Sequence, residues 1–141
     1  MDAKEGELTG GCGCGAVRWR LDAPPVCAGY CHCTRCQRRT GTAASASAFA
    51  APGSLRITEG ADRIRAWRPD DGWEKHFCGD CGSALFSRDP DDPDRVGVRL
   101  GGFDGDPGVR PQDRQFTDFA VVWEPIPDDG LERHPGARPS R

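Results

Sequence analysis

Three cysteines lie within six positions of one another in the segment YCHCTRCQRRTG, residues 30–41: Cys31, Cys33 and Cys36. Thiolates are good zinc ligands, and a structural zinc site is normally closed by four protein ligands. Three ligands from the chain would leave one coordination position open for water, hydroxide or a substrate thiolate. The spacing therefore predicts a zinc site of the catalytic kind, with these three cysteines as its catalytic ligands.

A fourth protein ligand would instead close this site and remove the open position. In an extended strand Cys27, Cys31 and Cys33 lie on one face, so Cys27 is the strongest candidate for a closing ligand. The same alternation turns His32 to the opposite face, which makes it a weaker candidate. An open site with three cysteines and a closed site with Cys27 are therefore the two alternatives that follow from the spacing.

Four further cysteines form two pairs with the spacing of metal ligands: Cys12, Cys14, Cys78 and Cys81. The later pair, in FCGDCGSALF, resembles half of a zinc-ribbon knuckle, in which the glycines allow the backbone to turn its amide groups toward sulfur. A knuckle supplies two thiolates, and the earlier pair would supply two more from one face of an extended segment. The two pairs together predict a closed structural zinc site, with an apparent binding free energy on the order of 10 kcal/mol.

One histidine has a place near this predicted structural site. His76 shares a strand face with Cys78, so it is a candidate hydrogen-bond donor to the metal ligands. An ordinary polar role within the strand is the commoner function of a single histidine.

The bulk properties favour a protein of a reducing compartment. The N-terminal segment MDAKEGELTG has neither the basic nor the apolar region of a signal peptide, and no apolar run has the length to cross a bilayer. In such a compartment, eight cysteines are more typical of metal ligands than of disulfides. The formal net charge of −3 gives no electrostatic reason to expect nucleic acid or an anionic membrane as a partner. We therefore expect a cytoplasmic protein that binds neither.

Short segments separated by turns indicate a mainly β fold. Glycine and proline, with 19 and 12 residues, divide the chain throughout. The clearest alternation, in residues 16–22, places Val17, Trp19 and Leu21 on one face of a strand. A helix of one or two turns is expected around residues 34–40. The other expected strands are 26–33, 43–50, 54–58, 63–68, 73–78, 83–88, 95–101 and 116–123.

The length of 141 residues accommodates one domain. We expect a disordered N-terminus over residues 1–7, a single zinc-binding domain over residues 8–127 and a flexible C-terminal tail over residues 128–141. The two ends are polar, and the last segment is rich in proline and glycine, which is typical of chain that lacks a packed core.

Four segments together resemble the glutathione-dependent formaldehyde-activating enzyme family, which also includes centromere protein V: GGCGCGAVRWR, YCHCTRCQRRTG, FCGDCGSALF and VVWEPIPDDGL. The resemblance implies an Mss4-like fold of twisted β-sheets with little helix and two zinc ions. It implies the same division of ligands as the spacing. The structural ion is held by Cys12, Cys14, Cys78 and Cys81, and the catalytic ion by Cys31, Cys33 and Cys36. The position of Cys27 is not a ligand in the family as a rule, which favours the open site.

The resemblance also implies an activity, that of a carbon–sulfur lyase that joins glutathione and formaldehyde into S-(hydroxymethyl)glutathione. Zinc lowers the pKa of a bound thiol, and the resulting thiolate is the nucleophile that adds to an aldehyde carbonyl. A small thiol such as glutathione and an aldehyde-type substrate are the expected partners. Three arginines beside the proposed catalytic ion are candidates to bind the carboxylates of that thiol, or else form a solvated basic face: Arg35, Arg38 and Arg39.

A second hypothesis is a protein held together by zinc that does not catalyse a reaction. Such a protein would be a thiol carrier or a protein-interaction module. Both hypotheses require the structural site, and the enzyme hypothesis also requires the open second site.

Overall fold

The computed structural model describes residues 8–139 as two β-sheets and one short α-helix. Strands take 39% and helical turns 12% of the described residues, which confirms the expected mainly β fold with little helix. The expectation of a disordered N-terminus over residues 1–7 lies outside the described residues. No helix within residues 8–139 is long and apolar enough to cross a membrane.

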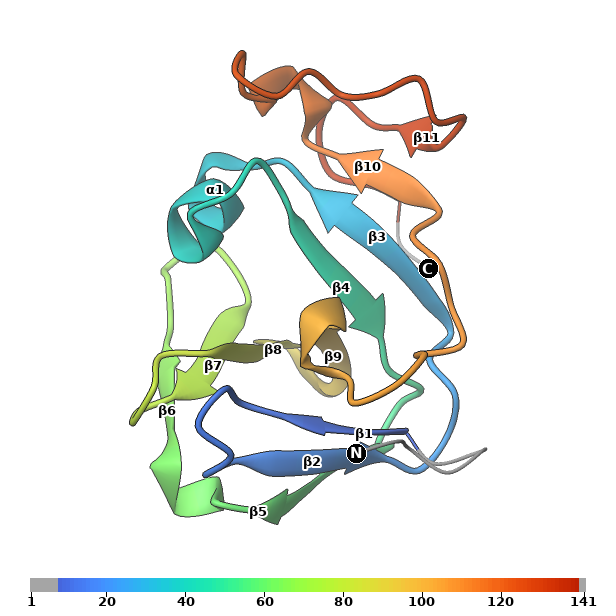
Figure 1. Ribbon diagram of the computed structural model, residues 1–141. Coiled ribbons are helices and arrows are strands. Elements are labelled where there is room, and N and C mark those ends of the chain that lie inside the picture. Colours follow the sequence, from blue (N-terminus) through green and yellow to red (C-terminus); the bar gives the residue numbers. More distant parts are fainter. Residues whose placement is uncertain (1–7, 140–141) are drawn as a thin grey trace.

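The smaller sheet is antiparallel and has three strands in the order β1-β2-β5, at the lower edge of Figure 1. Its strands are β1 (Leu8–Gly11), β2 (Arg18–Leu21) and β5 (Leu55–Glu59). The alternation expected in residues 16–22 is confirmed, because Val17, Trp19 and Leu21 are at most 3% exposed. Strand β1 was not expected, since its sequence LTGG carries no alternating apolar residues.

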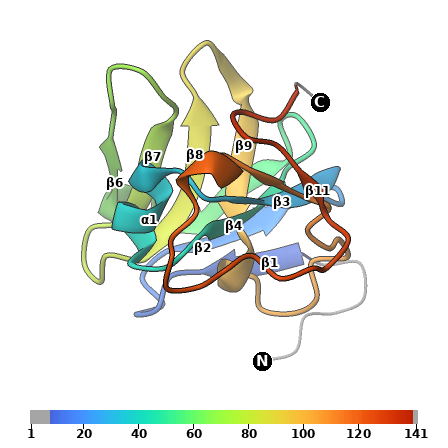
Figure 2. The same ribbon diagram turned by 90° about the horizontal axis from the view of Figure 1, so that it is seen from above.

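The larger sheet has eight strands in the order β11-β10-β3-β4-β9-β8-β7-β6. Strand β10 pairs in parallel with both β3 and β11, and the other neighbours are antiparallel. Figures 1 and 2 show the sheet as strongly curved, with the helix α1 beside β6 and β7. The strands are β3 (Cys27–Cys31), β4 (Ser45–Phe49), β6 (Ile64–Trp67), β7 (Glu74–Cys78), β8 (Ala84–Asp89), β9 (Asp92–Arg99), β10 (Asp113–Gln115) and β11 (Glu132–Arg133). Three short 3-10 helices are η1 (Ala61–Arg63), η2 (Leu100–Gly102) and η3 (Thr117–Phe119).

The hydrophobic core lies on one face of the larger sheet, against the apolar side of β2. Its buried members are Val17, Trp19, Leu21, Ala50, Cys78, Leu85, Phe86, Val96 and Val98. Side chains alternate along a strand, so the strand residues that flank these core residues in the larger sheet point to the opposite face of that sheet. We call this the outer face. The register pairs its members across strands, with Cys31 opposite Ser45, Ser47 opposite Arg99 and Lys75 opposite Ser87.

Helix α1 (Thr34–Thr40) follows β3 after two residues and confirms the helix expected around residues 34–40. Cys33 is its N-cap, and the Sγ atom of Cys33 accepts a hydrogen bond from the main-chain N–H of Cys36 at 3.3 Å. Gly41 ends the helix with a left-handed φ of 68°, and its N–H donates to the carbonyl of Gln37 at 2.8 Å. The turn of the helix brings Cys36 back toward the end of β3.

The strand expected over residues 116–123 is wrong. The chain pairs with β3 earlier, as β10, and residues 117–119 form η3 instead. Phe116 has a φ of 56°, a left-handed conformation that breaks an extended run directly after β10. The apolar residues that suggested a strand are left exposed, with Val122 at 94% and Trp123 at 65%.

The C-terminal segment contacts the larger sheet through its described residues, and the flexible tail expected over residues 128–141 stays a prediction. The structure describes this segment as far as residue 139 and places β11 beside β10. Beyond β11, the guanidinium of Arg138 donates to Asp113 Oδ1 at 3.0 Å and to the carbonyl of Tyr30 at 2.9 Å. The composition of the segment indicates flexibility, but it does not reveal that a buried carboxylate is available to Arg138.

Candidate metal centres

The first cluster joins two turns that lie far apart in the sequence. Cys12 and Cys14 lie in the turn between β1 and β2, and Cys78 and Cys81 lie at the turn between β7 and β8. All four Sγ atoms lie within 4.8 Å of one another, so the structure brings together the four residues expected to hold the structural ion. The first pair reaches the cluster from a turn and not from the extended segment that we expected. Four thiols at this spacing fit the donor set and geometry of zinc.

Hydrogen bonds fix the two turns around the first cluster. The N–H of Val17 donates to Cys12 Sγ at 3.2 Å, and Gly82, with a left-handed φ of 80°, donates to the carbonyl of Cys78 at 2.8 Å. The hydroxyl of Ser83 lies 3.2 Å from Cys81 Sγ, and this contact is the largest cause that lowers the pKa of Cys81, to about 5. A lowered thiol pKa favours the thiolate that a metal ion requires.

His76 packs into the core beside this turn. Its ring stacks on Phe86 with the centroids 4.5 Å apart, and its Nε2 lies 3.8 Å from Glu74. Burial lowers the pKa of His76. Among the described residues, no hydrogen bond joins His76 to the cysteines, so its proposed support of the metal ligands stays a prediction.

The second cluster is built from one short segment at the outer face. Cys31 ends β3, Cys33 caps α1, and Cys36 lies in the first turn of the helix, with their Sγ atoms within 4.8 Å of one another. Cys31 and Cys36 are buried, while Cys33 is partly exposed. Three thiols fit zinc as a site with an open position. The extended backbone at Cys33, followed at once by a helical turn, is what gathers three residues from six consecutive positions.

Hydrogen bonds within the second cluster move the pKa values of Cys31 and Cys36 in opposite directions. Hydrogen bonds from Cys31 and Cys33, and then from Ser45, lower the pKa of Cys36, and the nearby charge of Arg99 lowers it further. The same sharing raises the pKa of Cys31. Cys36 therefore gives up its proton more readily than Cys31.

Neither alternative fourth ligand joins the second cluster. Cys27 is buried at the other end of β3, opposite Phe49 of β4, and lies outside the group of three sulfur atoms. His32 lies on the other side of β3, where its Nε2 is 3.1 Å from Arg114 Nη1. Within residues 8–139, no further Cys, His, Asp or Glu completes this group. The arrangement is that of the open alternative.

The three arginines expected to bind the thiol differ in their surroundings. Arg35 donates to the carboxylate of Asp71 at 2.6 Å and lies over the ring of Trp67. Arg38 is exposed. Arg39 is partly buried, with its guanidinium carbon 6.0 Å from the ring centroid of Phe77 in β7. Arg39 is therefore the member of the three that lies on the outer face beside Cys36.

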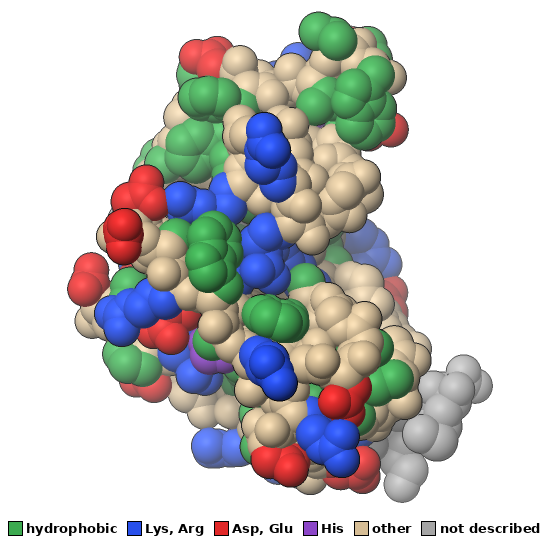
Figure 3. All heavy atoms as spheres, turned by 90° about the vertical axis from the view of Figure 1, so that its left-hand side faces the viewer, with side chains coloured by type: hydrophobic (Ala, Val, Ile, Leu, Met, Phe, Trp, Pro, Cys, Tyr) green, Lys and Arg blue, Asp and Glu red, His purple; other side chains and the backbone are tan. Residues whose placement is uncertain are grey.

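Two cations beside Cys36, Lys75 and Arg99, were not among the site residues expected from the sequence. Lys75 of β7 and Arg99 of β9 both act electrostatically on Cys36. Figure 3 shows basic side chains gathered on the side of the molecule that carries α1, β6 and β7, with acidic side chains mostly nearer its margins. Two features of the sequence could have indicated Lys75. It is two residues from Phe77 in a predicted strand, so the two share a face, and it is one of only two lysines in the chain, the other being Lys4.

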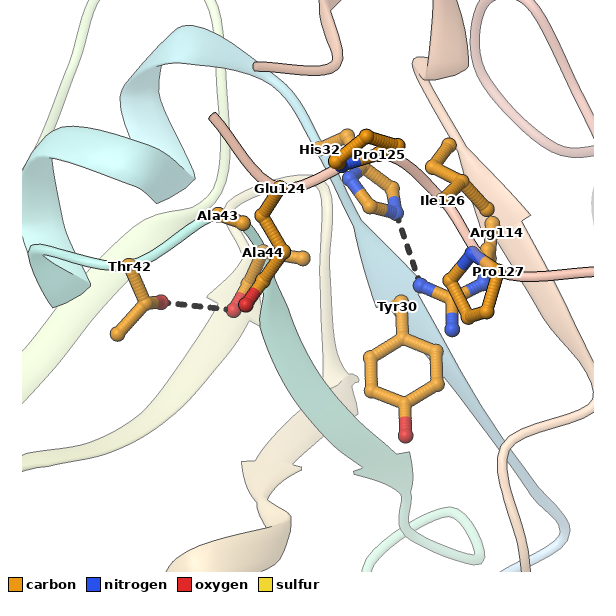
Figure 4. A pocket seen from close by; sticks show the side chains of 10 residues that line it. All are labelled: Tyr30, His32, Thr42, Ala43, Ala44, Arg114, Glu124, Pro125, Ile126 and Pro127. Carbon is orange, nitrogen blue, oxygen red and sulfur yellow. Dashed lines mark hydrogen bonds between the residues drawn. The ribbon is translucent and has the colours of Figure 1, made fainter. Parts of the chain in front are cut away.

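A separate pocket of about 430 Å³ lies on the other side of β3 from the second cluster. Figure 4 shows Tyr30, His32 and Arg114 along one wall, with residues 124–127 closing the rim. Arg114 lies over the ring of Tyr30 at 4.3 Å and pairs with Asp129 at 2.8 Å, so its charge is already balanced. No cysteine lines this pocket, which is therefore distinct from both cysteine clusters.

The fold and the two clusters define a class of small, mainly β proteins in which one closed and one open set of cysteines fits zinc. The family model described as "Glutathione-dependent formaldehyde-activating enzyme" matches residues 7–119. The chain belongs to this family, as its cysteine motifs indicated, and the expected twisted-sheet fold of the Mss4-like kind is confirmed.

Two individual proteins are similar to this chain. A Halomonas elongata protein named "Putative glutathione-dependent formaldehyde-activating enzyme" is 33% identical over 105 residues, which is 70% of this chain and 67% of that protein. A crystal structure of a Rhodobacter sphaeroides protein has a TM-score of 0.58 and 23% identity, and the match covers 89% of this chain and 98% of that one. The second likeness shows the fold alone.

Proposed function

We propose that this protein is a zinc-dependent carbon–sulfur lyase that joins glutathione, or another small thiol, with formaldehyde to give S-(hydroxymethyl)glutathione. The observation that carries the proposal is the second cluster, in which three cysteine sulfurs meet without a fourth protein ligand among the described residues. When bound there, zinc would hold the substrate thiol as the thiolate that attacks an aldehyde carbonyl.

In this proposal the chain's own residues divide the work between binding and positioning. Cys31, Cys33 and Cys36 hold the catalytic ion, and the cap that Cys33 provides fixes Cys36 relative to β3. Arg39 binds a carboxylate of the thiol, while Arg35 and Arg38 contribute at the rim of the site. The partly exposed Cys33 marks the side from which substrates approach.

The first cluster has a structural role in the proposal. It holds the structural zinc ion through Cys12, Cys14, Cys78 and Cys81 and ties the smaller sheet to the β7–β8 turn. We also propose a cytoplasmic location, where glutathione is abundant and thiols stay reduced.

Metal content and product formation test the proposed function together. Purified protein is expected to contain two zinc ions per chain by mass spectrometry. It is also expected to form S-(hydroxymethyl)glutathione faster than the reaction without protein, followed by NMR with labelled formaldehyde. Cys33→Ser should lose the rate acceleration and one zinc ion, while the control Cys27→Ala should keep both, since Cys27 lies outside the cluster.

The same measurements separate the enzyme from the thiol carrier. Two zinc ions and thiol binding without any rate acceleration would replace the enzyme by a carrier or interaction module. One zinc ion in the wild-type protein would remove the open site on which the proposal depends.

A further inference from the structure

Three cations on the outer face lie beside the second cluster without an acidic partner. They are Lys75 of β7, Arg99 of β9 and Arg39 of α1. The charge of Arg99 acts on both Arg39 and Lys75, and all three interact electrostatically with Cys36. Within residues 8–139, none of the three forms an ion pair with a carboxylate. These like charges have been brought together at the cost of mutual repulsion.

Two other arginines near this cluster, Arg35 and Arg138, are paired with carboxylates. Arg35 pairs with Asp71 at 2.6 Å, and Arg138, whose charge also reaches Cys31, pairs with Asp113 at 3.0 Å. Some cations at this site thus have a carboxylate partner, whereas Lys75, Arg99 and Arg39 have none among the described residues. The cations without a carboxylate partner interact electrostatically with Cys36 from α1, β7 and β9.

The unbalanced cations are also partly withdrawn from water. Burial lowers the pKa of both Lys75 and Arg39. The Nε atom of Arg39 is buried and has no hydrogen-bond partner within the described part of the chain. A polar group left in this state costs free energy unless a ligand satisfies it.

Neighbouring side chains hold the cations in place. The ring of Phe77 lies under the guanidinium of Arg39, and the hydroxyl of Ser47 accepts a hydrogen bond from Arg99 Nη1 at 3.3 Å. Lys75 is two residues from Phe77 and so shares its face of β7. The three cations therefore come from three different elements that converge on one place.

A zinc ion at the second cluster would leave part of this positive charge unbalanced. Three thiolates with one divalent ion would carry a single negative charge, and a bound substrate thiolate would add one more, against three cations from Lys75, Arg99 and Arg39. The remaining positive charge favours a substrate that brings a further anionic group to this place.

We propose that Lys75, Arg99 and Arg39 form an anion subsite that binds a carboxylate of the thiol substrate and selects anionic thiols over neutral and cationic ones. This inference rests on the proposed function for its thiol, and it adds Lys75 and Arg99 as the residues that determine specificity. Arginine and lysine bind carboxylates through charge-assisted hydrogen bonds, which are stronger than neutral ones.

Three thiols of similar size test the subsite with the zinc-loaded protein: 3-mercaptopropionate, 2-mercaptoethanol and cysteamine. By calorimetry, we expect affinity to fall in that order, from the anionic through the neutral to the cationic thiol. Lys75→Met and Arg99→Met each remove the positive charge and keep an unbranched apolar side chain at the position. Each should weaken binding of 3-mercaptopropionate about tenfold and change binding of 2-mercaptoethanol by less than about twofold.

Arg56→Met is the matched control. It removes one positive charge from β5 of the smaller sheet, where Arg56 pairs with Asp22, and should leave the order of the three thiols unchanged. Added salt provides a measurement that needs no variant. It should weaken binding of the anionic thiol to the wild-type protein more than binding of the neutral one.

S-Methylglutathione separates this inference from the proposed function, because it has carboxylates and no free thiol. If it binds, and Lys75→Met weakens that binding, the subsite stands even where no formaldehyde adduct forms. Equal affinity of the wild-type protein for all three thiols would overturn the subsite, even in a protein that catalyses the reaction. An equal loss for anionic and neutral thiols in Lys75→Met would also overturn it.

Discussion

The Sγ atom of Cys33 accepts a hydrogen bond from the main-chain N–H of Cys36, so one proposed metal ligand caps the helix that carries another. This relationship would couple metal binding at the second cluster to the start of α1. It also means that a substitution at Cys33 affects both the metal and the helix, unless the new side chain can still cap.

Serine and alanine at position 33 are expected to separate the two roles. Cys33→Ser should lower zinc content by one ion per chain and abolish thiol binding, while the fold is kept because serine is a good N-cap. Cys33→Ala should lose the ion as well and be less stable than Cys33→Ser by about 1 kcal/mol. Denaturant unfolding of both variants measures the difference. Equal stability would show that the cap contributes nothing.

Loss of a ligand from the first cluster is expected to be far more damaging. Cys78→Ser should give unfolded or insoluble protein, because the four cysteines join segments 64 residues apart and a structural zinc site contributes on the order of 10 kcal/mol. Circular dichroism and the melting temperature measure the outcome. Cys27→Ala is the control for loss of a buried thiol and should remain folded with both ions. An unchanged melting temperature in Cys78→Ser would contradict the structural role.

Acid release of zinc should depend on Ser83. The Ser83 hydroxyl is the largest of several causes that lower the pKa of Cys81, to about 5, so it favours the thiolate that the metal ion requires as the pH falls. Ser83→Ala should raise the pKa of Cys81 and move zinc release to a higher pH by about half a unit. A colorimetric zinc indicator follows the release across a pH series. Thr58→Ala, at an exposed position of β5, should release zinc at the wild-type pH.

The C-terminal segment should contribute to stability through Arg138. Its side chain is 11% exposed and pairs with Asp113, which is 5% exposed, so Arg138→Ala leaves a buried carboxylate without its nearest cation. We expect a loss of about 3 kcal/mol in the free energy of unfolding. Arg110→Ala removes an exposed pair with Asp106 and should cost less than about 1 kcal/mol. Similar losses in the two variants would show that the segment is not held by Arg138.

The sequence was most informative where chemistry requires fixed residue types at fixed spacing. The helix after Cys33 and the alternation around Trp19 could be predicted because each follows from local geometry. The two cysteine sets could be predicted because each pair or triplet has the spacing of metal ligands and a closed zinc site needs four of them. Strand β10 and the contacts of Arg138 could not, since they depend on which distant segment offers a free strand edge or a carboxylate. Lys75 and Arg99 were missed for the same reason, because they approach Cys36 only after the larger sheet has curved.

The different spans of the two clusters have a consequence for assembly during synthesis. The second cluster needs six consecutive residues, so its donors are all present soon after Cys36 leaves the ribosome. The first cluster cannot be completed until Cys81 has emerged, and only then can the β1–β2 turn be tied to the β7–β8 turn. A nascent chain stopped before Cys78 would thus hold the complete triplet at Cys31, Cys33 and Cys36 and half of the other set. A metal ion could therefore bind the second cluster before the first cluster is complete.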